Sequence, residues 1–182
     1  MTGQLRSVIT GGPGAGKSTL LAAISACGIP THHEVARAIL QAPGGMEMRA
    51  ARPSDFAMAM LKAEQDAWGA AKRGVSLYDR GFPDIVGFLR LEGLPVPPEL
   101  DRICRELRYD GSIFRAPPWR EIYTPDEERI QNWNDAVASD VAVSAAWKHY
   151  GYSLIDLPFV ALKDRVEFVV GHMNANRKDM YK

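Results

Sequence analysis

The chain has 182 residues, 46% of them hydrophobic, which suits one α/β domain with a substantial core. Its 22 basic and 22 acidic side chains balance to a formal net charge of zero, which argues against a general nucleic-acid binder. No apolar run has the length of a signal peptide or a membrane span, so we expect a cytoplasmic protein. Cys27 and Cys104 lack metal-type spacing and are expected to be buried thiols.

The first predicted elements flank a glycine-rich loop. A short apolar strand ends at Thr10, the loop "GGPGAGKST" covers residues 11–19, and a helix is predicted over 17–27. Gly11, Gly16, Lys17 and Ser18 fit the pattern G-x-x-x-x-G-K-[ST]. Glycines let successive backbone N–H groups converge on an anion, and the N-terminus of the following helix adds its dipole. The sequence therefore predicts a phosphate-binding loop.

Each part of this loop has an expected task. Lys17 is expected to neutralise the outer phosphates, and Ser18 to bind Mg²⁺ with Thr19 beside it. Loop and ion together suit a nucleoside triphosphate, and we expect Mg-ATP. The residues predicted to bind the nucleotide are Gly11, Gly12, Pro13, Gly14, Ala15, Gly16, Lys17, Ser18 and Thr19.

Strands and helices alternate along the rest of the chain. Further strands are predicted at 29–34, 74–79, 111–116 and 152–157. Helices are predicted at 34–41, 53–73, 81–92, 97–107, 124–149 and 160–174. This alternation predicts a parallel sheet covered on both faces, with the chemistry at the carboxyl ends of its central strands.

Asp79 and Arg80 follow the predicted strand 74–79 directly. A carboxylate beside the phosphate loop can hold Mg²⁺ through water, or accept the proton of an attacking hydroxyl. The alternative is that Asp79 only caps the helix that follows.

Four stretches together resemble a known family: "ITGGPGAGKSTL", "HEVARAIL", "YDRGFPDIVGFLRLEG" and "PPWREIYTPDEERIQ". They are similar to small AAA-like P-loop ATPases and kinases, close to the nicotinamide riboside kinase domain of NadR-type proteins. The resemblance spans nearly the whole chain and implies one domain, 1–182, with the three-layer P-loop kinase-like fold, a five-stranded parallel sheet of order 2-3-1-4-5, ATP and Mg²⁺. It also implies that Glu34, Arg37 and Arg80 face an acceptor pocket.

A lid is predicted over about 115–129, where prolines disfavour helix. P-loop kinases bring arginines to the transferring phosphate in this way, so Arg115, Arg120 and Arg129 join Lys17 and Asp79 as candidate catalytic residues. The resemblance favours Arg129, and surface ion pairs are the alternative for each arginine.

The pair Asp79-Arg80 differs from motor ATPases of the AAA type, which have two adjacent acids at the end of this strand. An acid followed by arginine resembles nucleoside and nucleotide kinases instead. We therefore predict an ATP-dependent kinase of a nucleoside-like or other hydroxylated small acceptor, with an ATPase switch for a protein partner as the alternative. Gln65 and Asp66 are candidates to read the acceptor's polar groups, although a solvated helix face is the simpler interpretation.

Overall fold

The computed structural model describes residues 4–71, 74–123 and 132–179. Five strands form one sheet in the order β2-β3-β1-β4-β5, and every neighbouring pair is parallel. This confirms the predicted fold class and strand order. The strands are β1 (Leu5–Thr10), β2 (Thr31–His32), β3 (Val75–Asp79), β4 (Ile113–Arg115) and β5 (Leu154–Asp156).

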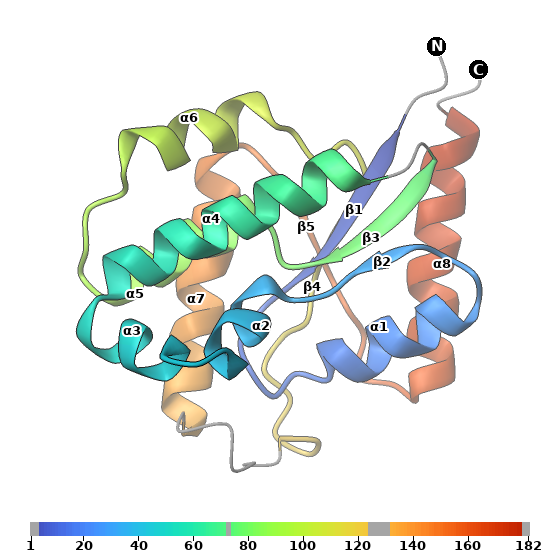
Figure 1. Ribbon diagram of the computed structural model, residues 1–182. Helices are drawn as coiled ribbons and strands as arrows, with labels where there is room; N and C mark the ends of the chain where they lie inside the picture. Colours follow the sequence, from blue (N-terminus) through green and yellow to red (C-terminus); the bar gives the residue numbers. More distant parts are fainter. Residues whose placement is uncertain (1–3, 72–73, 124–131, 180–182) are drawn as a thin grey trace.

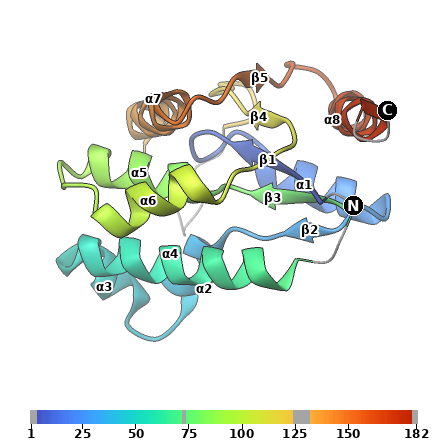
Figure 2. The ribbon, with the colours of Figure 1, turned by 90° about the horizontal axis from the view of Figure 1, so that it is seen from above.

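Helices cover both faces of the sheet, so the domain has three layers (Figures 1 and 2). The helices α1 (Lys17–Ala26) and α8 (Leu162–Asp179) pack together on one face. The other face carries α4 (Pro53–Ala70), α5 (Phe82–Leu91), α6 (Pro98–Glu106) and α7 (Trp133–His149). Two short helices, α2 (Val35–Gln41) and α3 (Gly45–Ala51), lie against α4.

The central strand β1 supplies side chains to two separate cores. Successive strand side chains point to opposite faces, so Val8 and Ile9 divide between them. Val8 belongs to the core under α4–α7, which contains Phe56, Tyr78 and Trp147. Ile9 belongs to the core under α1 and α8. Because helices cover both faces of the sheet, functional groups near β1 and β3 are accessible only in the loops at the ends of these strands.

Several predicted boundaries differ from the structure. The helix was predicted to begin at 124, but α7 begins at Trp133. The residue before it, Asn132, is non-helical (φ −79°, ψ 177°) and caps the helix. The Asn132 side chain accepts the Asp135 N–H at 3.1 Å, and the Asp135 carboxylate accepts the Asn132 N–H at 3.0 Å. This reciprocal cap satisfies two orphan donors and fixes the helix start. The expected cap over 124–127 lies outside the described residues.

Two further predictions need correction. The helix α3, which begins at Gly45 after the N-cap Gly44, was not among the predicted helices. Cys27 is exposed, because it is the C-cap of α1 rather than part of its buried face, whereas Cys104 is buried as predicted. Among the described helices, none combines the length and apolarity needed to cross a bilayer.

Candidate active site

The predicted phosphate loop connects β1 to α1. Gly11, Gly14 and Gly16 have φ values of 128°, 76° and 75°, a backbone region that side chains disfavour. A side chain at Gly11 would also collide with the carbonyl of Ala116. The helix α1 begins at Lys17. The glycines are therefore required by the loop geometry, and the loop leads directly into a helix N-terminus.

Lys17 points back into the loop that it follows. Its Nζ donates hydrogen bonds to the carbonyl oxygens of Gly11 (3.1 Å) and Gly12 (2.6 Å). Burial, and to a smaller extent the charge of Arg80, lower the pKa of Lys17 to about 8. An anion at the loop would oppose both effects and favour the ammonium form.

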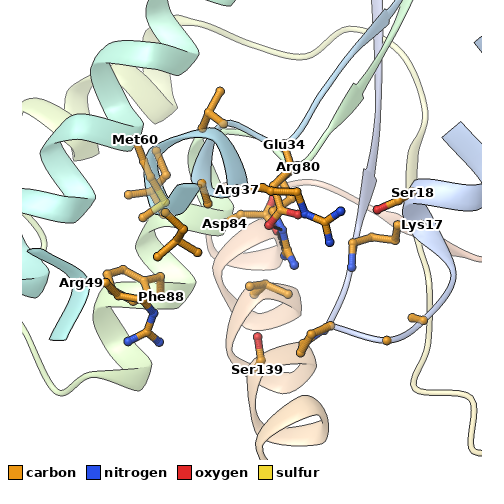
Figure 3. A pocket seen from close by; sticks show the side chains of 18 of the residues that line it. Lys17, Ser18, Glu34, Arg37, Arg49, Met60, Arg80, Asp84, Phe88 and Ser139 are labelled. Atoms are coloured by element: carbon orange, nitrogen blue, oxygen red, sulfur yellow. Dashed lines mark hydrogen bonds and ion pairs between the residues drawn. The ribbon is translucent and has the colours of Figure 1, made fainter. Parts of the chain in front are cut away.

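Arg80 connects the phosphate loop to Glu34, another predicted acceptor residue (Figure 3). It has a φ of 74°, a strained conformation for a residue with a side chain. Its Nε donates to Glu34 Oε1 at 2.7 Å, and its Nη1 donates to the Gly11 carbonyl at 2.9 Å. Burial alone would raise the pKa of Glu34, but Arg80 and Lys17 outweigh it and hold that pKa below its usual value. Glu34 is therefore a carboxylate at neutral pH.

Asp84 is a central residue that the sequence analysis missed. Its carboxylate accepts hydrogen bonds from Thr10 Oγ1 (2.6 Å), Trp147 Nε1 (2.9 Å) and the backbone N–H of Gly81 (3.0 Å). The last bond caps α5, so Asp84 and not Asp79 performs the capping that we considered for Asp79. An acid three residues after the N-cap, Gly81, was the available sequence signal.

Asp79 lies beneath the loop at the end of β3. The residue is 4% exposed, and its Oδ1 atom has no hydrogen-bond partner. Burial, and to a smaller extent the charge of Glu34, raise the pKa of Asp79 to about 6, although Lys17 and Arg80 oppose the rise. An unsatisfied buried carboxylate oxygen is costly and marks a functional position.

One cavity of about 980 Å³ joins the loop to the acceptor side. Lys17 and Ser18 lie on one side of it and Met60 and Phe88 on the other, with Glu34, Arg37 and Arg80 between them (Figure 3). The structure thus brings the predicted loop and acceptor residues into one site. Asp79 is behind the lining rather than in it. The apolar end is lined by Val35, Leu40, Phe56, Met60, Ile85 and Phe88.

The predicted lid arginines are distributed differently. Arg115 is the last residue of β4, and its guanidinium pairs with Asp140 (2.6 Å) and Asp156 (3.0 Å). The hydrogen bonding that Arg115 donates to Asp140 is the main reason that the pKa of Arg115 is raised. Arg115 does not line the cavity, so its prediction as a phosphate ligand is unsupported by the geometry. The Arg120 guanidinium lies 4.9 Å from the centre of the Trp133 ring. Arg129 lies outside the described residues.

Arg165, on α8, reaches the phosphate loop without having been predicted. It is 4% exposed, its Nη2 donates a long 3.4 Å bond to the Ala15 carbonyl, and its Nε has no partner. Its guanidinium lies 5.6 Å from the centre of the Trp119 ring. In the described part of the chain no carboxylate pairs with it, and burial lowers its pKa. No local motif marks Arg165, because about 150 residues separate it from the loop.

Glu64, on α4, is the second unexpected site residue. It lines the cavity and is 3% exposed. Its neighbours Gln65 and Asp66 were the candidate acceptor contacts on this helix. Asp66 is exposed and pairs with Lys62 at 3.3 Å, so it belongs to the solvated face of the helix. Glu64 is in phase with Phe56 and Met60, four residues apart, and that spacing was the signal available.

A parallel sheet of order 2-3-1-4-5 with G-x-x-x-x-G-K-[ST] after its central strand defines a P-loop protein with the kinase strand order. Within that class the chain belongs to the AAA domain family, whose model matches residues 6–165. A sequence search of curated proteins found no match.

Solved structures share the fold. Deoxyadenosine kinase from M. mycoides, with dCMP and dCDP bound, is 15% identical with a TM-score of 0.72, covering 94% of this chain and 100% of that one. The NadR protein in complex with NR is 16% identical with a TM-score of 0.66. That match covers 94% of this chain and 52% of the NadR chain. At these identities the comparison establishes the fold.

Proposed function

We propose that the protein is a kinase that transfers the γ-phosphate of ATP to a hydroxyl group of a small, nucleoside-like acceptor. One observation carries the proposal: a single cavity joins the phosphate loop to an apolar chamber, with Glu34 and Arg80 at the junction. Hydrolysis needs room for water alone at the γ-phosphate. A chamber lined by Phe56, Met60 and Phe88 suits an organic acceptor instead.

The nucleotide side consists of the loop, Lys17 and Arg165. The loop N–H groups and the Lys17 ammonium stabilise charge on the phosphate oxygens. Arg165 is a second buried cation beside Ala15, and an anionic ligand would supply the counter-charge that it lacks. Its flat guanidinium and Trp119 also suit the purine of ATP.

Mg²⁺ fits the donor set at this end of the cavity. Ser18 supplies an exposed hydroxyl at the start of α1, and Asp79 supplies the unsatisfied Oδ1, through water. Bound there, the ion would neutralise phosphate charge. Among the described residues no three His, Cys, Asp or Glu side chains form a metal cluster, so oxygens of the nucleotide and of water would complete the shell.

The acceptor side is built around the Glu34–Arg80 pair. Glu34 is ionised and lines the cavity, so it can accept a hydrogen bond from an acceptor hydroxyl and orient it. Asp79 has a pKa of about 6, near physiological pH, but lies behind the cavity lining, so it is the candidate to hold the metal-bound water or to take the hydroxyl proton through a water. Arg37 adds positive charge at the same junction.

The structural relatives support this assignment. The M. mycoides kinase structures contain dCMP, dATP and dCTP, and the NadR structure contains NR. These are nucleosides or nucleotides bound to the same fold. A cytoplasmic location stays a prediction.

An acceptor screen tests the proposal. ADP release from Mg-ATP is measured with each member of a panel of nucleosides and other hydroxylated metabolites, with Lys17→Met as the inactive control. We expect one compound or one chemical class to stimulate release strongly over the background. Slow release that no compound changes would contradict the kinase and favour the ATPase switch.

A further inference from the structure

Glu64 lies on the wall of the apolar chamber. Phe56, Met60 and Glu64 follow one another at four-residue spacing on α4, so the carboxyl group continues an apolar stripe. All three residues line the cavity, opposite Ile85 and Phe88 of α5. The chamber is therefore apolar and partly aromatic, with one carboxyl group set into its wall.

The surroundings of Glu64 explain why this carboxyl group is unusual. Within the described residues no hydrogen bond or ion pair engages it, whereas Glu34 and Asp84 are both bound by Arg80. Burial raises the pKa of Glu64 well above its usual value, and the charges of Asp84, Asp79 and Glu34 add to the rise, opposed by Arg80. Because Glu64 lines the cavity, an acceptor bound there can supply the hydrogen-bond partner that the described residues do not.

We propose that Glu64 accepts a hydrogen bond from an NH₂ group on the flat ring of the acceptor, and so makes the kinase prefer an amino- or carboxamide-bearing ring over the same ring carrying oxygen. This inference rests on the proposed function. A carboxyl group can accept from N–H whether it is ionised or protonated, but it can donate to an oxygen only when it is protonated. At the exocyclic position of the ring, an NH₂ group thus pairs with both forms of Glu64, and an oxygen pairs only with the protonated form.

Three matched pairs of acceptors test the preference. They are 2′-deoxyadenosine with 2′-deoxyinosine, 2′-deoxycytidine with 2′-deoxyuridine, and nicotinamide riboside with nicotinic acid riboside. In each pair an NH₂ group is replaced by oxygen while the ring shape is kept. In the first two pairs the neighbouring ring nitrogen also gains a hydrogen, and in the third the oxygen member carries a negative charge. We expect kcat/KM to favour the NH₂ member by about tenfold or more in every pair that the enzyme uses, since one such bond is worth about 1–3 kcal/mol. Equal use, or preference for oxygen, would overturn the inference.

Two variants of Glu64 separate recognition from a structural role. Glu64→Leu removes both polar atoms, and should bring the two members of a pair within about threefold of each other. Glu64→Gln presents an amide that both donates and accepts, so it should raise kcat/KM for the oxygen member. Asp66→Asn, two residues away on the exposed face, is the control and should leave the ratio unchanged. If Glu64 had a purely structural role, its substitution would lower kcat/KM for both acceptors of a pair by the same factor.

A direct measurement of acceptor binding separates the proposed role of Glu64 from the proposed kinase activity. Calorimetry with each nucleoside, in the presence of a non-hydrolysable ATP analogue, measures the same preference without turnover. Thermal unfolding of both variants checks that they fold, and the Gln variant serves if the Leu variant does not. If none of the six compounds binds, the inference fails, although phosphorylation of another panel member would still uphold the kinase. If nucleosides bind with the NH₂ preference but no phosphate is transferred, the proposed function fails and Glu64 keeps its role.

Discussion

The Nε atom of Arg80 donates a 2.7 Å hydrogen bond to Oε1 of Glu34. The same guanidinium reaches the Gly11 carbonyl at 2.9 Å, so one side chain connects the acceptor residue to the phosphate loop. Arg80 holds this position from a left-handed backbone conformation, with a φ of 74°. Such strain persists where the surroundings fix a functional geometry.

Arg80→Lys should therefore impair turnover more than nucleotide binding. Lysine keeps the charge but not the planar fork that contacts Glu34 and Gly11 together. We expect kcat to fall about 100-fold or more, the range seen when one positioned donor is removed, while ATP affinity changes less than tenfold. Steady-state kinetics and calorimetry measure the two effects. A kcat within twofold of the parent would show that the fork is unnecessary.

ATP binding should take up a proton through Lys17. In the free protein burial lowers the Lys17 pKa to about 8, and the phosphates favour the charged amine, so they raise that pKa on binding. Between about pH 8 and 9 the free amine is largely neutral and must gain a proton. ATP affinity should then fall as pH rises through this range. Calorimetry in buffers of different ionisation enthalpy counts the protons.

The control for this experiment is Lys17→Met, which removes the titrating amine. The variant should bind ATP weakly and with no uptake from this source. Equal proton uptake in the parent and the variant would assign the effect to the nucleotide or to another group.

Asp79→Asn should stabilise the fold while it weakens turnover. The folded-state pKa of about 6 exceeds the ordinary aspartate value of 3.8, so the folded protein resists ionising this group. The associated loss of stability is absent below about pH 4 and complete above about pH 6. It amounts to about 3 kcal/mol, from about 1.4 kcal/mol per pH unit. The Asn variant should thus gain unfolding free energy over the parent as pH rises from 4 to 7.5.

Turnover of the same variant should fall by about 10²–10⁴, as expected when a general base is lost. Urea unfolding at pH 4 and pH 7.5 and kinetics with the acceptor measure the two effects. A pH-independent difference in stability would refute the raised pKa, and unchanged turnover would remove Asp79 from the mechanism.

Arg165→Met should lower ATP affinity without lowering stability. The variant removes a buried cation that lacks a carboxylate partner in the described chain, and methionine fits an apolar site. We expect about tenfold or more weaker ATP binding, since a charged hydrogen bond is worth about 1.5–3 kcal/mol. The control is Arg102→Met, at an exposed i,i+4 ion pair with Glu106. Unchanged ATP affinity together with a lower melting temperature would make Arg165 a support of the Ala15 carbonyl.

The parts of the site that the sequence predicted are local in the chain. The phosphate loop follows from a run of nine residues, and Asp79-Arg80 follows from the end of a strand. The sheet order came from the family resemblance, and the structure confirms it. The helix was predicted from 124, whereas α7 starts at Trp133 after the cap that Asn132 forms.

The parts that were missed depend on contacts between distant segments. Arg115 appeared to be a lid residue because its partners, Asp140 and Asp156, come from α7 and β5. Arg165 reaches the loop from α8, which no pattern near the loop reveals. Glu64 differs, since the spacing of Phe56 and Met60 already placed it on the buried face of its helix. A buried carboxyl group there contradicts the usual preference for apolar residues, and function is what such an exception indicates.

The central claim is that the γ-phosphate goes to an organic hydroxyl. ATP labelled in its γ-phosphate is incubated with the protein, Mg²⁺ and the best acceptor of the screen, and the products are separated. The account predicts that most of the label is on the acceptor, at a rate that depends on acceptor concentration, and that Arg80→Lys lowers that rate. Label found in inorganic phosphate, at the same rate with and without acceptor, would contradict it.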